Sequence, residues 1–352
     1  MAHAYEEAAA FLSKKLASGR RKLTPEVGII CGSGLSNLSE TLQNSETFHY
    51  SDIPGFPEAT VAGHTGELVF GSIGDVACVC MRGRFHYYEG NDMDTVVMPI
   101  RALRLLGVKL LIVTNAAGGL NPDFNVGDIM VIEDHFGLPG LAGNQPLRGP
   151  NNDVLGPRFP ALSDAYDEQL QTLVVEVAAQ LHLQQKLRHG TYCYVSGPCY
   201  ETRAEAGFLR KLGDAVGAST APEIIASKHC GVKSLGLSLI TNKVVSKGGA
   251  GGTGTGGEVA SHEEVLGAVA TSGKNVQALV QGVIAHPSMR AYLDKLDTLD
   301  ASAEKVPTSP TEKVAPAPSV GVASVDMGMS GMGVYAAVAL ISGLLFVLSR
   351  RT

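Results

Sequence analysis

Short apolar runs alternate with segments of helical periodicity along the first 290 or so residues, and this alternation constrains the fold most. Runs such as "EVGIIC" (26–31), "KLLIVT" (109–114) and "VKSLGLSLIT" (232–241) are typical of buried strands. Residues 94–107 and 162–184 have helical spacing. Strands and helices alternating at this distance predict an α/β protein with a mostly parallel sheet covered by helices. Ligands in such sheets bind beyond the carboxyl ends of the strands, so the loops at those ends are the candidate sites.

Composition and charge narrow the classes of function. The chain has 352 residues, of which 45% are hydrophobic, and a formal net charge of −6. The absence of a long basic block argues against a nucleic-acid partner. None of the six cysteines lies in a C-x-x-C pair, and no Cys/His cluster has zinc spacing. Since most of the cysteines lie in apolar runs, we expect free thiols that are mostly buried, and no metal site.

Two strand ends carry residues suited to an anion. "CGSGL" (31–35) places Ser33 between glycines, whose backbone N–H groups can approach a phosphate. "RGRFHYYEG" (82–90) places Arg84 and His86 on one face of an extended segment. Phe85 then points into packing, and the arginine fork suits a phosphate. The alternative is a polar loop with some rings buried in the core.

Three short patterns predict helix starts with capping boxes. Thr202 to Glu205, Thr220 to Glu223 and Ser261 to Glu264 each have a Ser or Thr followed three residues later by Glu. Helix starts favour anions, and these would place Glu201, Ser219 and His262 at such ends. Ordinary helix capping is the alternative interpretation of each pattern.

Three further loops are candidates. In "TNAAGGLNP" (114–122) the backbone N–H of Ala116 is available to a ligand, and His64 lies in a loop between glycines. Residues 247–258 contain a G-x-G-x-x-G match, but the acidic residue of a dinucleotide site is missing downstream. A lid hinge is the preferred interpretation of that segment.

The C-terminal part differs in composition. From about residue 298 the chain is rich in Pro, Ala and Ser, which predicts a disordered linker. Residues 327–349 carry no charge, and their apolar part is about long enough for one bilayer crossing. We expect a catalytic domain over 1–290, a linker over 291–326 and a single transmembrane tail anchor over 327–352. A core helix docked on the domain is the alternative. Because the N-terminus lacks the apolar stretch of a secretory signal, we expect a cytoplasmic catalytic domain held at a membrane.

Taken together, the loops resemble one family, the trimeric, low-molecular-mass purine nucleoside phosphorylases. The matching stretches include "IICGSGL", "GHTGELVFG", "GRFHYYEG", "VTNAAGGLNP", "GPCYETRAE", "VGASTAPE", "LITNKV" and "SHEEV", in family order over about residues 5–287. The resemblance implies a twisted mixed sheet that forms a distorted β-barrel surrounded by helices. It also implies a homotrimer, with no metal and no organic cofactor, and inorganic phosphate as co-substrate.

The resemblance also implies roles for individual residues. Catalysis would rest on Asn242, Glu201, His86 and His262. Phe159 would reach the site of a neighbouring subunit. Phosphate would be held by Ser33, His64, Arg84, Phe85, His86, Ala116 and Ser219. The nucleoside would meet Tyr88, Phe159, Tyr200, Glu201, Ala218, Asn242 and His262.

The implied reaction is the reversible phosphorolysis of 6-oxopurine nucleosides such as inosine and guanosine, since the amide of Asn242 can donate to O6. Tyr200 replaces the usual Phe, Ala218 replaces the usual Met, and the loop between Asn242 and His262 is longer and richer in glycine than in the family. The alternatives are a 6-aminopurine thionucleoside phosphorylase, a catalytically weakened, membrane-tethered nucleoside-binding protein, and a nucleotide-dependent oxidoreductase.

Overall fold

A closed ring of strands forms the centre of the molecule. The computed structural model describes residues 3–18, 22–32, 35–58, 65–245 and 262–303. Within these residues the ring runs in the order β5, β8, β7, β6, β9, and β9 pairs back onto β5. The strand bounds are β5 (Leu110–Gly119), β8 (Ala215–Gly217), β7 (Leu187–Tyr194), β6 (Ile129–Gly137) and β9 (Lys233–Lys243).

The sheet continues from the ring through β5. β1 pairs with β5 and with β4 in parallel, whereas β3 pairs with β4 and with β2 in antiparallel fashion. Every residue of β1 is buried, as its unbroken apolar run predicted. These strands are β1 (Val27–Cys31), β2 (Gln43–His49), β3 (Glu67–Ile73) and β4 (Val76–Arg82). The distorted barrel within a mixed sheet is thereby confirmed, while the mostly parallel sheet holds for only part of the pairings.

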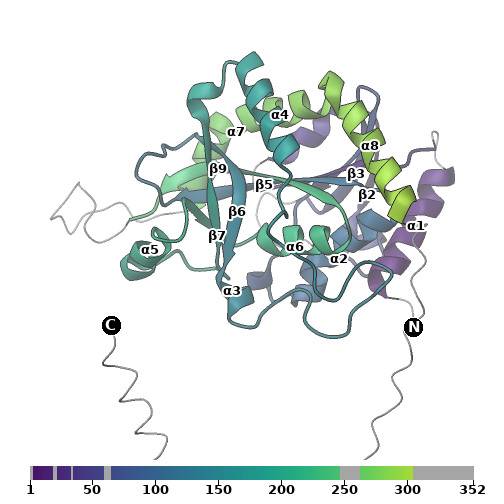
Figure 1. Ribbon diagram of the computed structural model, residues 1–352, viewed down its shortest axis with the longest axis horizontal. Coiled ribbons are helices and arrows are strands. Elements are labelled where there is room, and N and C mark those ends of the chain that lie inside the picture. The colour runs from purple at the N-terminus through teal and green to yellow at the C-terminus, as the bar shows by residue number, and fades with distance from the viewer. Residues whose placement is uncertain (1–2, 19–21, 33–34, 59–64, 246–261, 304–352) are drawn as a thin grey trace, which may run out of the picture. The chain divides into compact units, whose positions relative to one another are not determined.

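Helices cover the sheet in two layers, which Figure 1 shows above and below the strands. One core cluster joins the sheet to α1, α2 and α6, and a second joins it to α4, α7 and α8. A small α5 lies apart from both layers (Figure 1). The helix bounds are α1 (Ala4–Ser18), α2 (Met93–Leu105), α3 (Leu138–Leu141), α4 (Glu168–Gln180), α5 (Arg203–Leu209), α6 (Ala221–His229), α7 (His262–Ile284) and α8 (Pro287–Ala303).

Two boundaries differ from those expected. The helix expected over 162–184 begins at Glu168, because the carboxylate of Asp167 caps it by accepting from the backbone N–H groups of Gln169 (3.0 Å) and Leu170 (3.1 Å). The linker is expected to begin at residue 291, but residues 291–303 belong to α8, so that predicted boundary is wrong.

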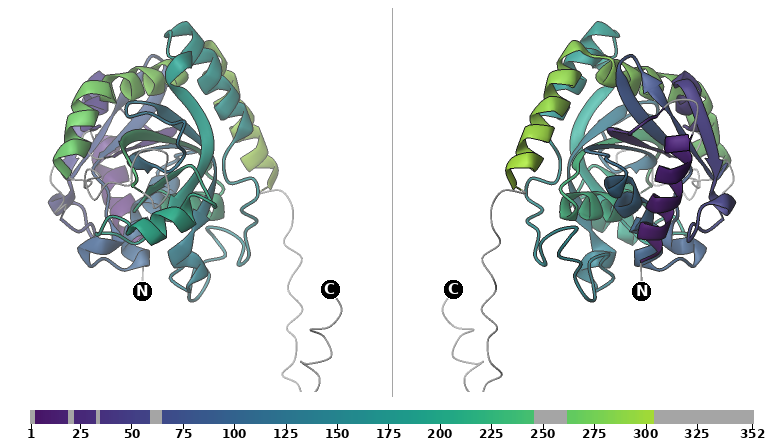
Figure 2. Two further views of the ribbon diagram at one scale, coloured as in Figure 1. Left: turned by 90° about the vertical axis from the view of Figure 1, so that its left-hand side faces the viewer. Right: turned by 90° about the vertical axis from the view of Figure 1, so that its right-hand side faces the viewer.

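Helix α8 packs on the domain through its apolar side. Met289, Leu293 and Leu296 are buried in the core cluster shared with α4 and α7. Figure 2 shows α8 running beside α4, and Lys295 donates to Gln169 of α4. The folded unit therefore extends to Ser302.

The predicted linker and transmembrane tail beyond residue 303 lie outside the described residues. Among the helices that the structure does describe, none combines the length and apolar character needed to span a bilayer.

Candidate active site

A cavity of about 390 Å³ opens where the strands end. The ends of β1, β4, β5, β7, β8 and β9 all contribute to its wall, as expected for ligand sites in such sheets. The predicted site residues that line it are Arg84, His86, Tyr88, Ala116, Tyr200, Glu201, Ala218, Ser219 and Asn242. Residues more than 150 positions apart in the sequence thus meet in one hollow.

Close backbone approach at Gly32 shapes the floor of the cavity. A Cβ atom at this position would lie 2.7 Å from the main-chain oxygen of Thr114 and 2.8 Å from the Cα of Asn115. The backbone N–H of Gly32 donates to the hydroxyl of Thr114 over 3.1 Å. Only glycine lets the end of β1 pack this closely against β5.

Arg84 forms the cationic end of the cavity. Only 2% of its surface is exposed, and its NH1 donates to a carboxylate oxygen of Glu223 (3.1 Å) and to the hydroxyl of Thr220 (3.3 Å). Its NH2 donates to the main-chain oxygen of Thr114. The guanidinium is therefore oriented before any ligand arrives.

The capping box expected at Thr220 is not formed. Thr220 has a φ of +74° and a ψ of −56°, and its side chain makes no cap hydrogen bond. Ala221 N–H donates to the main-chain oxygen of Ser219 over 2.8 Å, so Thr220 is the central residue of a strained γ-turn. The Thr220 hydroxyl accepts instead from Asn115 Nδ2 (2.8 Å) and Arg84, and Glu223 pairs with Arg84. The expectation failed because two buried donors from elsewhere in the fold, Asn115 on β5 and Arg84 after β4, compete for these acceptors.

The equivalent prediction at Thr202 is confirmed. Thr202 Oγ1 accepts from the backbone N–H of Glu205 (3.3 Å), and Glu205 accepts from that of Thr202 (2.8 Å). This box starts α5 and leaves Glu201 just before the helix, where it lines the cavity. The third box lies at Ser261, outside the described residues.

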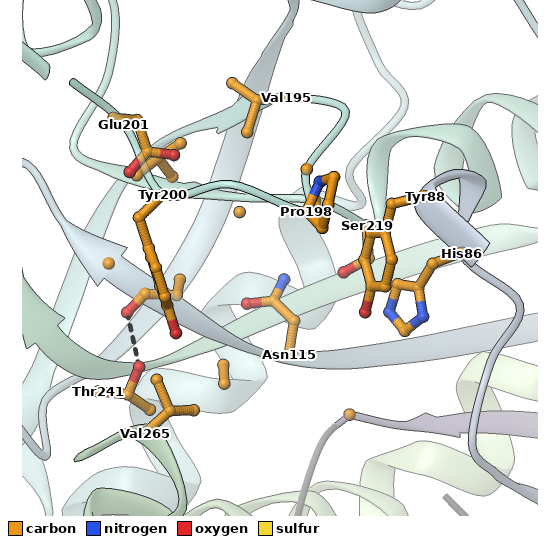
Figure 3. A pocket seen from close by; sticks show the side chains of 18 of the residues that line it. His86, Tyr88, Asn115, Val195, Pro198, Tyr200, Glu201, Ser219, Thr241 and Val265 are labelled. Carbon is orange, nitrogen blue, oxygen red and sulfur yellow. Dashed lines mark hydrogen bonds between the residues drawn. The ribbon is translucent and has the colours of Figure 1, made fainter. Parts of the chain in front are cut away.

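His86 is oriented by a carboxylate from its own loop. Glu89 Oε1 accepts from His86 Nδ1 (2.9 Å) and from the His86 backbone N–H (2.8 Å). Since a carboxylate only accepts, Nδ1 carries the hydrogen in this arrangement. The ring stacks on Tyr88 with centroids 4.6 Å apart, and Figure 3 shows both rings on one side of the cavity.

Tyr200 and Glu201 stand on the opposite side of the cavity, with the amide of Asn115 between the two groups (Figure 3). Burial raises the pKa of the Glu201 carboxyl above its usual value, and nearby Glu205 adds to this effect. Asn242 is almost fully buried, and its Oδ1 accepts from the hydroxyl of Thr241 over 3.2 Å. The Thr241 hydroxyl also lies 3.3 Å from the main-chain oxygen of Ala117, and it can donate to only one of the two oxygens. In this arrangement the amide oxygen of Asn242 faces Thr241, and its NH₂ is the group that can donate to a ligand.

The loop before Glu201 depends on a second glycine. Gly197 has a φ of +66°, and a Cβ there would lie 2.9 Å from the ring of Tyr88 and 3.1 Å from Ala218 Cβ. This close contact joins the wall that carries Tyr200 to the wall that carries Tyr88. The small side chain of Ala218 leaves room for this close approach of Gly197.

Some predicted residues are not placed at the cavity. The ring of Phe85 is buried in the core against Tyr50 and Phe56, so its side chain does not line the expected phosphate site. Phe159 is 88% exposed and does not line this chain's cavity. Ser33 and His64 lie outside the described residues, as does the side chain of His262, whose backbone begins α7.

Comparison with known proteins identifies the family. The sequence profile of the Phosphorylase superfamily matches residues 26–285. The chain belongs to this superfamily. It is 51% identical to the purine nucleoside phosphorylase of Bos taurus over 262 residues, which cover 74% of this chain and 89% of that protein.

Comparison with solved structures of phosphorylases supports the same family. The fold is similar to that of Schistosoma mansoni purine nucleoside phosphorylase in complex with inosine, with a TM-score of 0.73 and 41% identity, covering 80% of this chain and 95% of that one. The same enzyme in complex with adenosine gives a TM-score of 0.74 at 41% identity, covering 80% and 96%.

Sequence reasoning missed several residues of this phosphorylase-superfamily site. Asn115 and Thr241 line the cavity and direct neighbouring polar groups, and Glu89 and Glu223 hold His86 and Arg84. Glu89 could have been found from its position three residues after His86. Glu223 could not, because its local pattern indicates only a helix cap.

A metal is not suggested by the described part of the chain, where no group of three or more His, Cys, Asp or Glu side chains has a geometry suited to an ion.

Proposed function

We propose that this chain is a purine nucleoside phosphorylase that carries out the reversible phosphorolysis of 6-oxopurine nucleosides. One observation carries the proposal. His86 and Ser219 lie on one side of a single cavity, and Glu201 lies on the other (Figure 3). Arg84, which shares Thr220 with Ser219, and Asn242, which bonds to Thr241 beside Tyr200, line the same cavity. Arg84, His86 and Ser219 suit a phosphate, and Glu201 and Asn242 suit a 6-oxopurine. The names and bound nucleosides of the similar proteins support the same function.

The phosphate end supplies the nucleophile. Phosphate would be bound by the guanidinium of Arg84, by His86, by Ser219 and by the backbone N–H of Ala116. Ser33 and His64 are proposed to complete this site. A phosphate oxygen attacks C1′ of the ribose as the bond from C1′ to the purine nitrogen breaks, and the electron pair of that bond leaves with the purine. The purine nitrogen takes up the proton that the phosphate gives up, so the products are the purine base and pentose 1-phosphate.

The purine end stabilises the leaving group. Negative charge grows on the purine as the bond breaks, and the NH₂ of Asn242 would donate to N7 or O6, where that charge accumulates. Glu201 would accept from N1–H. Fixed donors aimed at developing charge lower the barrier, and losing one often costs about 100-fold or more in rate. Tyr200 would pack on the base, while Tyr88, Ala218 and His262 would meet the ribose.

A coupled assay tests the proposal. Purified protein should convert inosine to hypoxanthine only when phosphate is present, with one ribose 1-phosphate formed for each base. We propose that no metal or organic cofactor is needed, so dialysis against a chelator should leave the rate unchanged. Inosine loss that is independent of phosphate would refute the phosphorylase reaction.

A preference for 6-aminopurines is the second candidate, favoured by the similar enzyme that binds adenosine. Faster turnover of adenosine or methylthioadenosine than of inosine would favour it. The orientation of the Asn242 amide, with its NH₂ available, supports the 6-oxopurine instead.

We further propose that the chain acts as a homotrimer. Val154 is 90% exposed and Phe159 is 88% exposed on one long loop, and Arg158 lies over the Phe159 ring. Phe159 would enter a neighbour's cavity, where it would contact the ribose between the phosphate end and the purine end. Light scattering should give a trimer, and mixing inactive Phe159→Ala and Asn242→Ala subunits should restore activity, because mixed assemblies contain intact sites. Monomers, or no restoration, would refute this arrangement.

We also propose that the C-terminal residues form a tail anchor that holds the catalytic domain in the cytoplasm at a membrane. Its support is the uncharged stretch over residues 327–349. Deleting residues 326–352 should release the protein from membranes without loss of activity. A truncated protein that still sediments with membranes would refute the anchor.

A further inference from the structure

We propose that Glu223 is a positioning residue that holds Arg84 from behind and tunes the affinity for phosphate. The inference rests on the proposed function and deepens it. Glu223 is 2% exposed and is absent from the residues that line the cavity, whereas Arg84 lines it. The carboxylate therefore acts on a bound anion through Arg84 and not by contact.

The geometry fixes the direction of the guanidinium. Within the described part of the chain, Arg84 donates to Glu223 on α6, to Thr220 in the γ-turn and to the main chain of Thr114 on β5. A planar guanidinium held at several of its donors has little freedom to rotate. The side of the fork that faces the cavity is thereby aimed at the place where phosphate would bind.

An unsatisfied oxygen indicates that this carboxylate serves more than packing. Glu223 Oε2 is buried and accepts no hydrogen bond from the described part of the chain. A buried carboxylate oxygen without a partner destabilises the fold. A glutamine would offer the same single acceptor to Arg84 without a buried charge, so comparing the two side chains isolates what the charge does.

The role of the charge follows from electrostatics at the buried end of the cavity. The Arg84–Glu223 pair has side chains that are 2% and 3% exposed, so the charges act with little screening by water. Glu223 offsets part of the positive charge that Arg84 presents to phosphate. Phosphate is then bound less tightly in the ground state, and it keeps the electron density that it needs to attack C1′.

Glu205 provides a matched control. It occupies the same position in α5 as Glu223 does in α6, three residues after a threonine, but it caps its own helix at the surface. Glu205→Gln removes the same charge from the same helical position without touching Arg84. It should leave the phosphate affinity unchanged.

Two variants separate charge from reach. Glu223→Gln keeps an acceptor for Arg84 and loses the charge, so phosphate should bind roughly 3- to 10-fold more tightly. Glu223→Asp keeps the charge, but its side chain is one methylene shorter and no longer reaches Arg84. Its phosphate KM should rise, and kcat should fall about 10-fold or more. The inosine KM should change little in either variant.

The measurement combines kinetics with phosphate-dependent thermal shifts, which give a dissociation constant without turnover. A merely structural Glu223 would weaken phosphate binding in both variants, and that result would overturn the inference. A wild-type phosphate affinity in both folded variants would overturn it as well. If the wild-type protein binds phosphate but does not cleave inosine, the proposed function fails, while the thermal shifts still decide the role of Glu223.

Discussion

The amide nitrogen of Asn115 lies 2.8 Å from the hydroxyl oxygen of Thr220, so a residue that lines the cavity is tied to one that is fully buried behind it. The same hydroxyl accepts from Arg84 over 3.3 Å. With both acceptor positions used, the hydroxyl hydrogen of Thr220 is directed to Ser219 Oγ at 3.4 Å. One buried hydroxyl thus orients three side chains of the phosphate end.

Thr220→Val tests this role with the shape of the side chain and its β-branching retained. Asn115 and Arg84 each lose an acceptor in a buried setting, so we expect a loss of about 1–3 kcal/mol in the free energy of unfolding. The phosphate KM should rise, while Thr220→Ser, which keeps the hydroxyl, should remain close to wild type. Denaturant unfolding and phosphate titration measure both effects, and an unchanged phosphate KM in the valine variant would contradict the network.

Glu201 couples stability to function through its raised pKa. Because burial raises that pKa in the folded state, the ionised carboxylate destabilises the fold. Glu201 then makes the free protein less stable as the pH rises from the ordinary value of 4.5 through the raised pKa. Glu201→Gln should therefore raise the Tm of the free protein near neutral pH while weakening inosine binding.

The same titration sets a pH dependence for the wild-type enzyme. As the pH falls through the raised pKa, Glu201 becomes protonated and no longer offers a charged acceptor to N1–H of the purine. The kcat/KM for inosine should fall on the acid side at a pH above the usual glutamate value. An acid limb that persists unchanged in Glu201→Gln would assign the titration to another group.

Asn242→Asp should change the base preference. The carboxylate cannot donate to O6 of a 6-oxopurine, whereas it can accept from a 6-amino group. We expect inosine kcat/KM to fall by about 100-fold or more, with the ratio of adenosine to inosine turnover rising. Parallel assays with both nucleosides measure the shift, and an unaltered ratio would remove Asn242 from base recognition.

Helix α8 is clamped to the domain by a charge network. Arg290 donates to both carboxylate oxygens of Glu26, over 2.7 and 2.8 Å, and Lys109 donates to the same carboxylate over 3.2 Å. These bonds hold the pKa of Glu26 below its usual value of 4.5, with the Arg290 bond the largest cause. Their contribution is complete above that value and is lost as the pH falls below it.

Glu26→Gln should cost roughly 1 kcal/mol of stability at pH 7, since the pair is partly exposed to solvent. The difference from wild type should shrink as the pH falls below 4.5 and as salt is added. Activity should be retained, because in the described part of the chain neither Glu26 nor any residue of α8 lines the cavity. A destabilisation that is independent of pH would mean that Glu26 acts through packing.

Local sequence patterns predicted much of the fold and of the site. The apolar runs and the polar or glycine-rich segments at their ends placed Arg84, His86, Ala116 and Ser219 at strand ends, where the cavity lies, and the family resemblance added Asn242. These patterns depend only on residues that are close together in the sequence, so they hold in any fold that buries the apolar runs. The roles of these cavity residues, and those of Ser33, His64 and His262, stay predictions.

Tertiary structure decided what two identical local patterns become. Thr202 with Glu205 forms a helix cap because solvent surrounds it, whereas Thr220 with Glu223 serves Arg84, which lies 139 positions from Glu223 in the chain. Likewise, the start of the expected linker became α8, because Met289 and Leu293 found an apolar surface beside α4 and α7. A sequence window shows the donors and acceptors that a segment carries, but only the packed chain determines which distant groups compete for them.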